Sequence, residues 1–167
     1  MAEKAAPTLE ELIARMAKIQ PKLRRRRLTL AVAESCTGGL LAAVLTSHGG
    51  SSEHFRGGAV VYSDEAKEIL ADVAPQLIHS HGAVSSVVAG ALARGARSRL
   101  DAKIGLGITG ISGPGGATPG KPVGLTYVAV DSGKHSAVKK HLWTFDRSGN
   151  RLASVNAALD LLEEALD

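Results

Sequence analysis

The stretch LTLAVAESCTGGLLAAVLT, residues 28–46, holds the pattern that decides the fold. Its first part, residues 28–33, is an apolar run of β-compatible residues and predicts a buried strand. A polar turn that contains two glycines follows, and residues 40–46 are apolar and favour a helix. The stretch therefore predicts a strand–turn–helix unit with Ser35 at the point where the strand ends.

Strands and helices alternate along the rest of the chain. The further strands are predicted at residues 58–62, 102–109, 125–130 and 137–145, and Lys139 and Lys140 mark the last of these as an edge strand. The helices are predicted at residues 8–22, 63–70, 85–100 and 150–166. Thr8 and Glu11 have the spacing of a capping box at the start of the first helix. This alternation predicts an α/β fold, a three-layer α/β/α domain with a largely parallel, mixed sheet.

The length and composition fit one domain. A chain of 167 residues provides one good-sized core, so we assign residues 1–167 to a single domain. Residues 1–27 would be an N-terminal helix and a basic linker that includes the run Arg24–Arg27. Hydrophobic residues make up 44% of the chain but aromatic residues only 3%, which predicts a core of aliphatic side chains.

The composition limits where in the cell the protein is expected and which classes of partner it is expected to bind. Cys36 is the single cysteine, so no internal disulfide can form, as is usual in the cytoplasm. No stretch approaches about 20 apolar residues, which argues against a membrane span. The formal net charge of +4 favours anionic partners, while the scarcity of aromatic platforms for base stacking argues against a nucleic acid. We therefore expect a cytoplasmic protein with a small-molecule partner.

Three partial motifs and six scattered histidines do not carry their usual chemistry here. GLGITG at residues 105–110 matches a dinucleotide-binding pattern, but it lies inside a predicted strand and no helix follows it. Residues 115–121 match a phosphate-binding loop up to its lysine, but Pro122 stands in place of Ser or Thr. SAVK at residues 136–139 lies in a strand, where its serine and lysine face opposite sides. No histidine group converges like a zinc site, so we expect no metal and no cofactor.

Three other segments carry chemically useful residues where strands end. AESCTGG at residues 33–39 places Ser35 at the start of a helix, where free N–H groups can stabilise an oxyanion, or where Ser35 is only a helix cap. YSDEAK at residues 62–67 brings a tyrosine and a lysine to the same sheet edge, although Lys67 also fits a solvated helix residue. TGISGPGG at residues 109–116 can wrap an anion with backbone N–H groups.

Together these segments resemble the CinA C-terminal domain family. The family's AESCTGG turn is present unchanged, and its YSNxAK motif is present except that Asp64 replaces asparagine. GAVS at residues 82–85, the TGxxGPxGG loop and KPVG at residues 121–124 occur in the family's order. Asp146, Arg147 and Arg151 are similar to its DRxxxR motif. The resemblance covers roughly residues 9 to 166, and because larger members carry a separate N-terminal domain, it implies the stand-alone form.

The resemblance implies a metal-independent amidase that converts nicotinamide mononucleotide into nicotinate mononucleotide and ammonia. Ser35 would be the nucleophile and Lys67 its base, with Tyr62 positioning the pair. Backbone groups near Cys36 and Thr37 would form the oxyanion hole, and the glycine-rich loop with Arg147 would hold the nucleotide. The substrate-binding residues implied in this way are Cys36, Thr37, Gly38, Thr109, Gly110, Gly113, Gly115, Gly116 and Arg147. A homodimer is the expected assembly.

Three alternatives stay open at this point. Cys36 rather than Ser35 could attack, since thiols are intrinsically better nucleophiles. The domain could also bind a nucleotide without efficient turnover. Finally, the run Arg24–Arg27 could serve a nucleic-acid accessory protein, whose binding would depend on salt.

Overall fold

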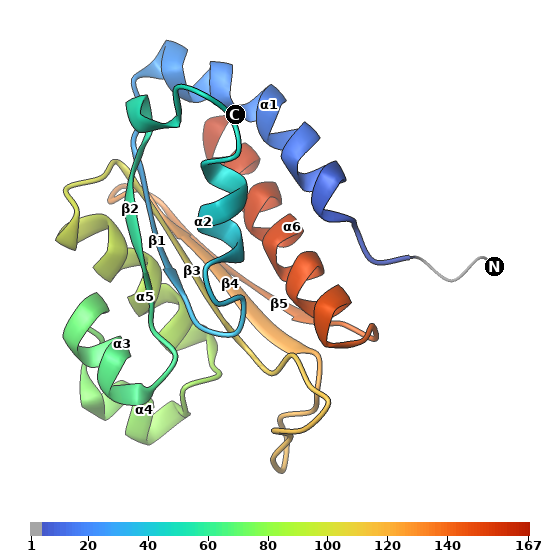
Figure 1. Ribbon diagram of the computed structural model, residues 1–167. Helices are drawn as coiled ribbons and strands as arrows, with labels where there is room; N and C mark the ends of the chain where they lie inside the picture. The colour runs from blue at the N-terminus through green and yellow to red at the C-terminus, as the bar shows by residue number, and fades with distance from the viewer. Residues whose placement is uncertain (1–4) are drawn as a thin grey trace.

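A computed structural model describes residues 5–167 and has a five-stranded sheet between two layers of helices (Figure 1). The strand order is β2-β1-β3-β4-β5. β1 (Leu30–Glu34) pairs in parallel with β2 (Phe55–Val60) and with β3 (Ile104–Gly110). β4 (Leu125–Asp131) and β5 (Ser136–Leu142) continue the sheet in antiparallel pairs. The α/β class and the mixed sheet are therefore confirmed, with two parallel and two antiparallel pairs.

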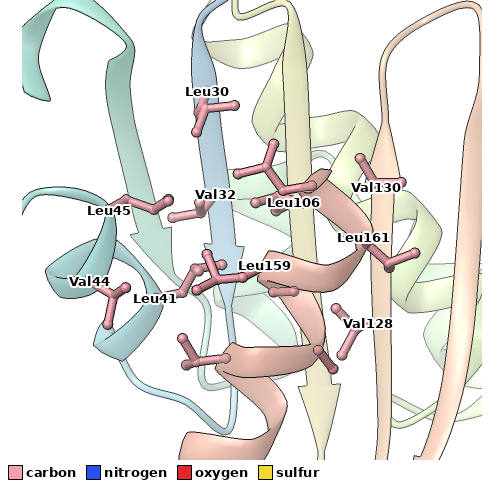
Figure 2. Close-up of a cluster of buried hydrophobic side chains, with 14 of the residues drawn as sticks. Leu30, Val32, Leu41, Val44, Leu45, Leu106, Val128, Val130, Leu159 and Leu161 are labelled. Atoms are coloured by element: carbon pink, nitrogen blue, oxygen red, sulfur yellow. The ribbon is translucent and has the colours of Figure 1, made fainter. Parts of the chain in front are cut away.

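The pleat of β1 divides its side chains between two cores. Leu30 and Val32 pack with helices α1 (Leu9–Arg26), α2 (Leu40–Leu45) and α6 (Arg147–Leu166) on one face (Figure 2). Ala31 and Ala33 pack on the other face, against α3 (Asp64–Ala71), α4 (Pro75–His81) and α5 (Ser86–Arg99). Because β1 is buried on both faces, it is apolar throughout except at its last residue, Glu34.

The chain order creates a switch point between β1 and β3. From β1 the chain passes through α2 and the short 3-10 helix η1 (Ser51–Glu53) to β2, on one side of β1. It then returns through α3, α4 and α5 to β3, on the other side. In open α/β sheets, ligands bind outside the carboxyl ends of strands at such a point. The turn after β1 and the loop after β3 meet there.

The prediction of a basic linker is wrong, because α1 continues to Arg26. Pro21 lies inside the helix, and the next turn is retained because Leu23 is fully buried in the core. The run Arg24–Arg26 forms the last turn, where cations are favourable near the helix carboxyl end, and Arg27 ends the helix in a left-handed conformation. The capping box of Thr8 and Glu11 is confirmed.

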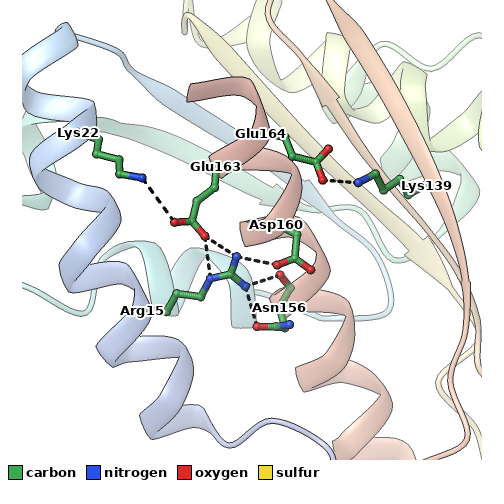
Figure 3. Close-up of polar contacts among 7 residues, drawn as sticks. All are labelled: Arg15, Lys22, Lys139, Asn156, Asp160, Glu163 and Glu164. Atoms are coloured by element: carbon green, nitrogen blue, oxygen red, sulfur yellow. Dashed lines mark hydrogen bonds and ion pairs between the residues drawn. The ribbon is translucent and has the colours of Figure 1, made fainter. Parts of the chain in front are cut away.

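A polar network attaches α1 to α6 (Figure 3). The Arg15 guanidinium donates to the Glu163 carboxylate and to the Asn156 side-chain oxygen, and it lies 2.6 Å from Asp160. Lys22 adds a longer contact to Glu163, at 3.8 Å. The side chains in these contacts are partly exposed, and water weakens ion pairs of this kind. The network therefore orients α1 more than it stabilises the fold.

Other boundaries differ from the predicted ones. α4 was not predicted, because a helix of seven residues carries too little periodicity to be distinguished from a loop. β2 begins and ends earlier than predicted, so Tyr62 lies two residues beyond the strand. α6 begins at Arg147 rather than near residue 150, with Asp146 as its cap. Within residues 5–167, no helix combines the length and the apolar character needed to cross a bilayer.

The glycines of GLGITG allow α5 to approach β3 closely. A Cβ atom at Gly107 would lie 2.5 Å from the Ala89 carbonyl oxygen and 2.6 Å from the Ala93 nitrogen. A Cβ atom at Gly105 would lie 1.9 Å from the Ala93 carbonyl oxygen. The motif therefore serves helix-on-sheet packing, in agreement with the rejection of a dinucleotide site.

Gly107→Ala should destabilise the domain because the new methyl group has to push α5 away from the sheet. Overpacking of this kind costs about 1–3 kcal/mol, which lowers Tm by roughly 2–4 °C per kcal/mol in a domain of this size. Thermal and denaturant unfolding would measure the change. Gly49→Ala is the matched control, because a Cβ atom there meets nothing within 4 Å. Equal Tm values for the two variants would contradict the close-packing argument.

Candidate active site

A cavity of about 290 Å³ opens at the carboxyl ends of β1 and β3. The turn after β1, the start of α3 and the loop after β3 contribute to it, together with the start of α6. It is lined by Ser35, Cys36, Tyr62, Asp64, Lys67, Ala83, Val84, Thr109, Gly110, Ile111, Ser112, Gly113, Gly115, Gly116 and Arg147.

The cavity brings together every predicted site residue except Thr37 and Gly38. Thr37 is fully buried behind the cavity wall, and Gly38 turns the chain in a left-handed conformation, with φ of 61°. Five lining residues were not predicted as part of the site: Asp64, Ala83, Val84, Ile111 and Ser112. Their position in the sequence indicates them, because each lies within one of the family motifs at residues 62–67, 82–85 and 109–116.

Glu34 occupies the amino end of α2. Its Oε2 atom accepts hydrogen bonds from the Thr37 hydroxyl at 2.6 Å and from the Leu41 N–H at 3.0 Å, and it has a longer contact with the Gly39 N–H at 3.3 Å. Its Oε1 atom accepts from the Ala42 N–H at 2.8 Å. The prediction that free N–H groups at the start of this helix face the site is therefore wrong, since a carboxylate already binds them.

Two N–H groups of the turn remain available. Within residues 5–167, neither the Cys36 N–H nor the Thr37 N–H donates to a backbone or side-chain oxygen, and the Cys36 N–H contacts only its own thiol sulfur. The Ser35 N–H donates to the Ile108 carbonyl oxygen, and this bond ties the turn to β3. Ser35 itself is 8% exposed and lines the cavity. Any oxyanion stabilised by this turn would have to use the Cys36 and Thr37 groups.

Lys67 is a buried lysine, not the solvated helix residue of the alternative interpretation. Its Nζ atom donates to the Val61 carbonyl oxygen at 2.9 Å and lies 3.4 Å and 3.5 Å from those of Tyr62 and Ser63. Burial lowers the pKa of Lys67, and the nearby Asp64 carboxylate partly opposes this shift. Within the described residues, Nζ makes no hydrogen bond to Ser35.

Cys36 is buried, and its burial raises the pKa of the thiol to about 11, more than the neighbouring Ser112 hydroxyl lowers it. A thiolate is the reactive form of cysteine, and with this pKa it would make up only about 0.01% of the thiol at pH 7. Burial therefore disfavours the nucleophilic thiolate form of Cys36.

Arg147 spans the mouth of the cavity. Its guanidinium donates to the Gly113 carbonyl oxygen at 2.7 Å and to the Tyr62 hydroxyl at 3.1 Å. Both partners are neutral, and no carboxylate within residues 5–167 forms an ion pair with Arg147. Its charge is therefore free to pair with an anion.

Buried side chains hold the glycine-rich loop in place. Asn150 donates from its amide to the Ser112 carbonyl oxygen at 3.0 Å, and the Thr109 hydroxyl donates to the Ala83 carbonyl oxygen at 2.8 Å. The Thr109 hydroxyl thus fixes the segment before α5. The loop is preorganised by groups from α6 and from the α4–α5 connection.

The described part of the chain contains no group of three His, Cys, Asp or Glu side chains placed to hold a metal ion. His79 and His81, the pair noted in the sequence, lie in the last turn of α4 and not in the lining of the cavity. The side chains that line the cavity with Ser35 instead include an amine, a guanidinium, hydroxyls, a thiol and the Asp64 carboxylate, which suit polar ligands.

The sequence profile of the CinA C-terminal domain matches residues 13–166. This chain belongs to the CinA C-terminal domain family. It is 53% identical over 144 residues to a CinA-like protein of Acidobacterium capsulatum and 49% identical to a competence-damage inducible protein of Moorella thermoacetica. Each match covers 86% of this chain but 35% of the relative, so the chain spans about a third of these curated relatives.

Solved structures of the family have the same fold. The competence/damage inducible protein CihA from Agrobacterium tumefaciens superposes with a TM-score of 0.90 at 34% identity. The superposition covers 98% of this chain and 99% of that chain. The resemblance found in the sequence motifs is therefore confirmed for family and fold.

The native Cys36 thiol should react slowly with thiol reagents. At pH 8, a pKa of about 11 leaves roughly 0.1% of the thiol ionised, and burial restricts access further. We expect Ellman's reagent to label the native protein at least about 100-fold more slowly than the protein unfolded in guanidinium, followed by absorbance. Equal rates in the two states would show an accessible thiolate and would reopen the case for Cys36 as nucleophile.

Proposed function

We propose that this CinA domain hydrolyses the carboxamide of nicotinamide mononucleotide to nicotinate mononucleotide and ammonia. The observation that carries the proposal is the single cavity shared by Ser35, the buried Lys67 and an arginine without a carboxylate partner. The first two groups suit acyl transfer, and the third suits the phosphate of a nucleotide. A small-molecule partner, a cytoplasmic location and a homodimer remain part of the proposal.

The reaction divides into two acyl transfers. The Ser35 hydroxyl oxygen attacks the carboxamide carbon while its proton passes to the neutral Lys67 amine, and the carbonyl oxygen becomes an oxyanion. The N–H groups of Cys36 and Thr37 are the candidate donors to it. As the C–N bond breaks, Lys67 returns the proton to the leaving nitrogen, which departs as ammonia. Water then attacks the ester by the reverse route and restores Ser35.

Lys67 must lose one proton before it can act as the base. In the structure its Nζ atom has one short and two long contacts with carbonyl oxygens. The neutral amine can keep the bond to Val61 and give up a long contact, which frees its lone pair. Since burial lowers the pKa of Lys67, the neutral form costs less than it would in water.

A nucleotide-binding module without efficient turnover is the second candidate. One observation favours it: Lys67 makes its hydrogen bonds to backbone carbonyl groups and not to Ser35, as a structural ammonium would. Both candidates use the same cavity and the same anion site. They differ in whether ammonia is released, and this is the first measurement to make.

Purified protein should release ammonia from nicotinamide mononucleotide at a rate that a chelator leaves unchanged, because the chemistry needs no metal. Nicotinamide riboside lacks the phosphate and should have a kcat/KM lower by at least about tenfold, the value of one charge-assisted contact.

Arg147→Ala should chiefly raise KM for the mononucleotide, while Arg25→Ala removes the same charge outside the cavity and should change nothing. Binding without ammonia release would instead favour the module, and equal kcat/KM for riboside and mononucleotide would rule out phosphate recognition.

The pH dependence should report Lys67. An unperturbed lysine is neutral in only about 0.04% of molecules at pH 7, and each unit of lowered pKa raises this fraction about tenfold. Because burial lowers the pKa of Lys67, kcat/KM should rise with pH to a plateau, and the midpoint of the rise should lie below the ordinary pKa of lysine.

Substitutions at the two residues complete this test. Lys67→Arg should be as damaging as Lys67→Ala, since arginine keeps its proton, whereas Lys18→Arg on the exposed side of α1 should be neutral. Ser35→Ala should abolish turnover, and the double variant should lose little more than either single one. A wild-type rate in Lys67→Arg would show that Lys67 is not the base.

A further inference from the structure

Glu34 is a buried acid without a role in the proton transfers of the proposed reaction. It is 1% exposed, and none of the ion pairs within residues 5–167 includes it. A buried carboxylate that has neither an ion pair nor hydrogen bonds destabilises the folded protein by several kcal/mol. Its compensation comes from one hydroxyl and three backbone N–H groups that follow it in the chain. All of these donors belong to the turn and helix that begin with Ser35.

These hydrogen bonds act on the turn from one side, and Arg151 acts from the other. The Arg151 guanidinium donates to the Thr37 carbonyl oxygen at 2.9 Å, while the Thr37 hydroxyl donates to Glu34 at 2.6 Å. Thr37 is thereby held at both its side chain and its backbone. Thr37 follows Cys36 directly, so the peptide unit that joins them is attached to a residue held at two points.

The carboxylate also removes the usual anion site of a helix start. The N–H groups of Leu41 and Ala42 would otherwise attract an oxyanion, but they already bind Glu34. The donors left in the turn are the N–H groups of Cys36 and Thr37, which precede the helix. Glu34 therefore determines which N–H groups of the turn can face a reacting carbonyl.

We propose that Glu34 is a positioning residue for Ser35, which holds the turn of residues 35–39 in its reactive conformation and leaves the Cys36 and Thr37 N–H groups as the oxyanion donors. This inference rests on the proposed function, because it takes Ser35 as the nucleophile. A carboxylate is required at this position: an amide keeps one acceptor oxygen but turns its NH₂ group toward the donors on the other side, and these then have no acceptor. A hydrocarbon would leave all four donors unsatisfied.

The matched pair Thr37→Val and Thr37→Ser tests this inference. Valine has the shape of threonine but lacks the hydroxyl that donates to Glu34, whereas serine retains that hydroxyl. We expect Thr37→Val to lower kcat about tenfold, the value of one hydrogen bond to a charged group, and Thr37→Ser, which restores the hydroxyl, to recover most of that loss. Glu34→Gln should lower kcat about 100-fold, as expected when a nucleophile is misplaced by about 1 Å.

Three readouts separate positioning from folding. Binding of the product nicotinate mononucleotide, measured by calorimetry, should be unchanged in Thr37→Val and Glu34→Gln, because Arg147 and the loop remain in place. Denaturant unfolding gives the stability of each variant. Thr8→Ala, which removes the cap of α1 far from the turn, is the control for lost stability and should retain the wild-type kcat. If Glu34→Gln does not fold, the threonine pair alone decides.

The rate at which a fluorophosphonate labels Ser35 makes the inference independent of the substrate. If the wild type is labelled but releases no ammonia, and labelling slows in Thr37→Val and Glu34→Gln, the proposed amidase activity fails and the positioning role stands. If the wild type is active and both variants keep its kcat and labelling rate, only the positioning role fails. It also fails if Thr8→Ala loses as much kcat as Glu34→Gln. A wild-type protein that is not labelled at Ser35 and releases no ammonia overturns both.

Discussion

The buried charge at the end of β1 is the constraint on which the site depends. β1 is enclosed on both faces, so its carboxyl end emerges among apolar layers, and Glu34 finds donors only in the chain that follows it. Satisfying this carboxylate requires α2 to begin beside the strand end. The intervening turn then carries Ser35 past the end of β1 and onto the wall of the cavity. The burial of β1 desolvates one carboxylate, and the start of α2 and the position of Ser35 follow from how that carboxylate is satisfied.

Much of the fold could be predicted because its signals are local. The apolar run of residues 28–33 and the capping box at Thr8 each depend on neighbours within one element, and both predictions hold to within two residues. The end of α1 could not be predicted, since Pro21 and four arginines suggest a stop, while the burial of Leu23 against distant residues extends the helix. α4 was missed because seven residues give too weak a pattern.

In the candidate site too, features with a local sequence signal could be predicted and features that depend on distant residues could not. Its lining could be predicted from motifs at strand ends and from the family resemblance, and the topology brings those motifs together. The groups that support the lining could not. Arg151 reaches the Thr37 carbonyl across 114 residues, and Asn150 reaches the Ser112 carbonyl across 38. Glu34 lies inside the AESCTGG motif, but nothing in the sequence indicates that its carboxylate binds the helix start eight residues later.

Burial shifts the pKa values of Cys36 and Lys67, which share the cavity with Ser35, in opposite senses, as the proposed serine–lysine mechanism requires. Desolvation disfavours the charged form of any group. It therefore raises the pKa of the Cys36 thiol, which stays protonated and inert, and lowers the pKa of Lys67, which moves toward the neutral amine that a base requires. A serine hydroxyl is neutral in its resting state and pays little for the same burial. In the proposed reaction, thiolate attack is therefore disfavoured, and in a cavity without a histidine in its lining Lys67 is the proposed base for the Ser35 hydroxyl.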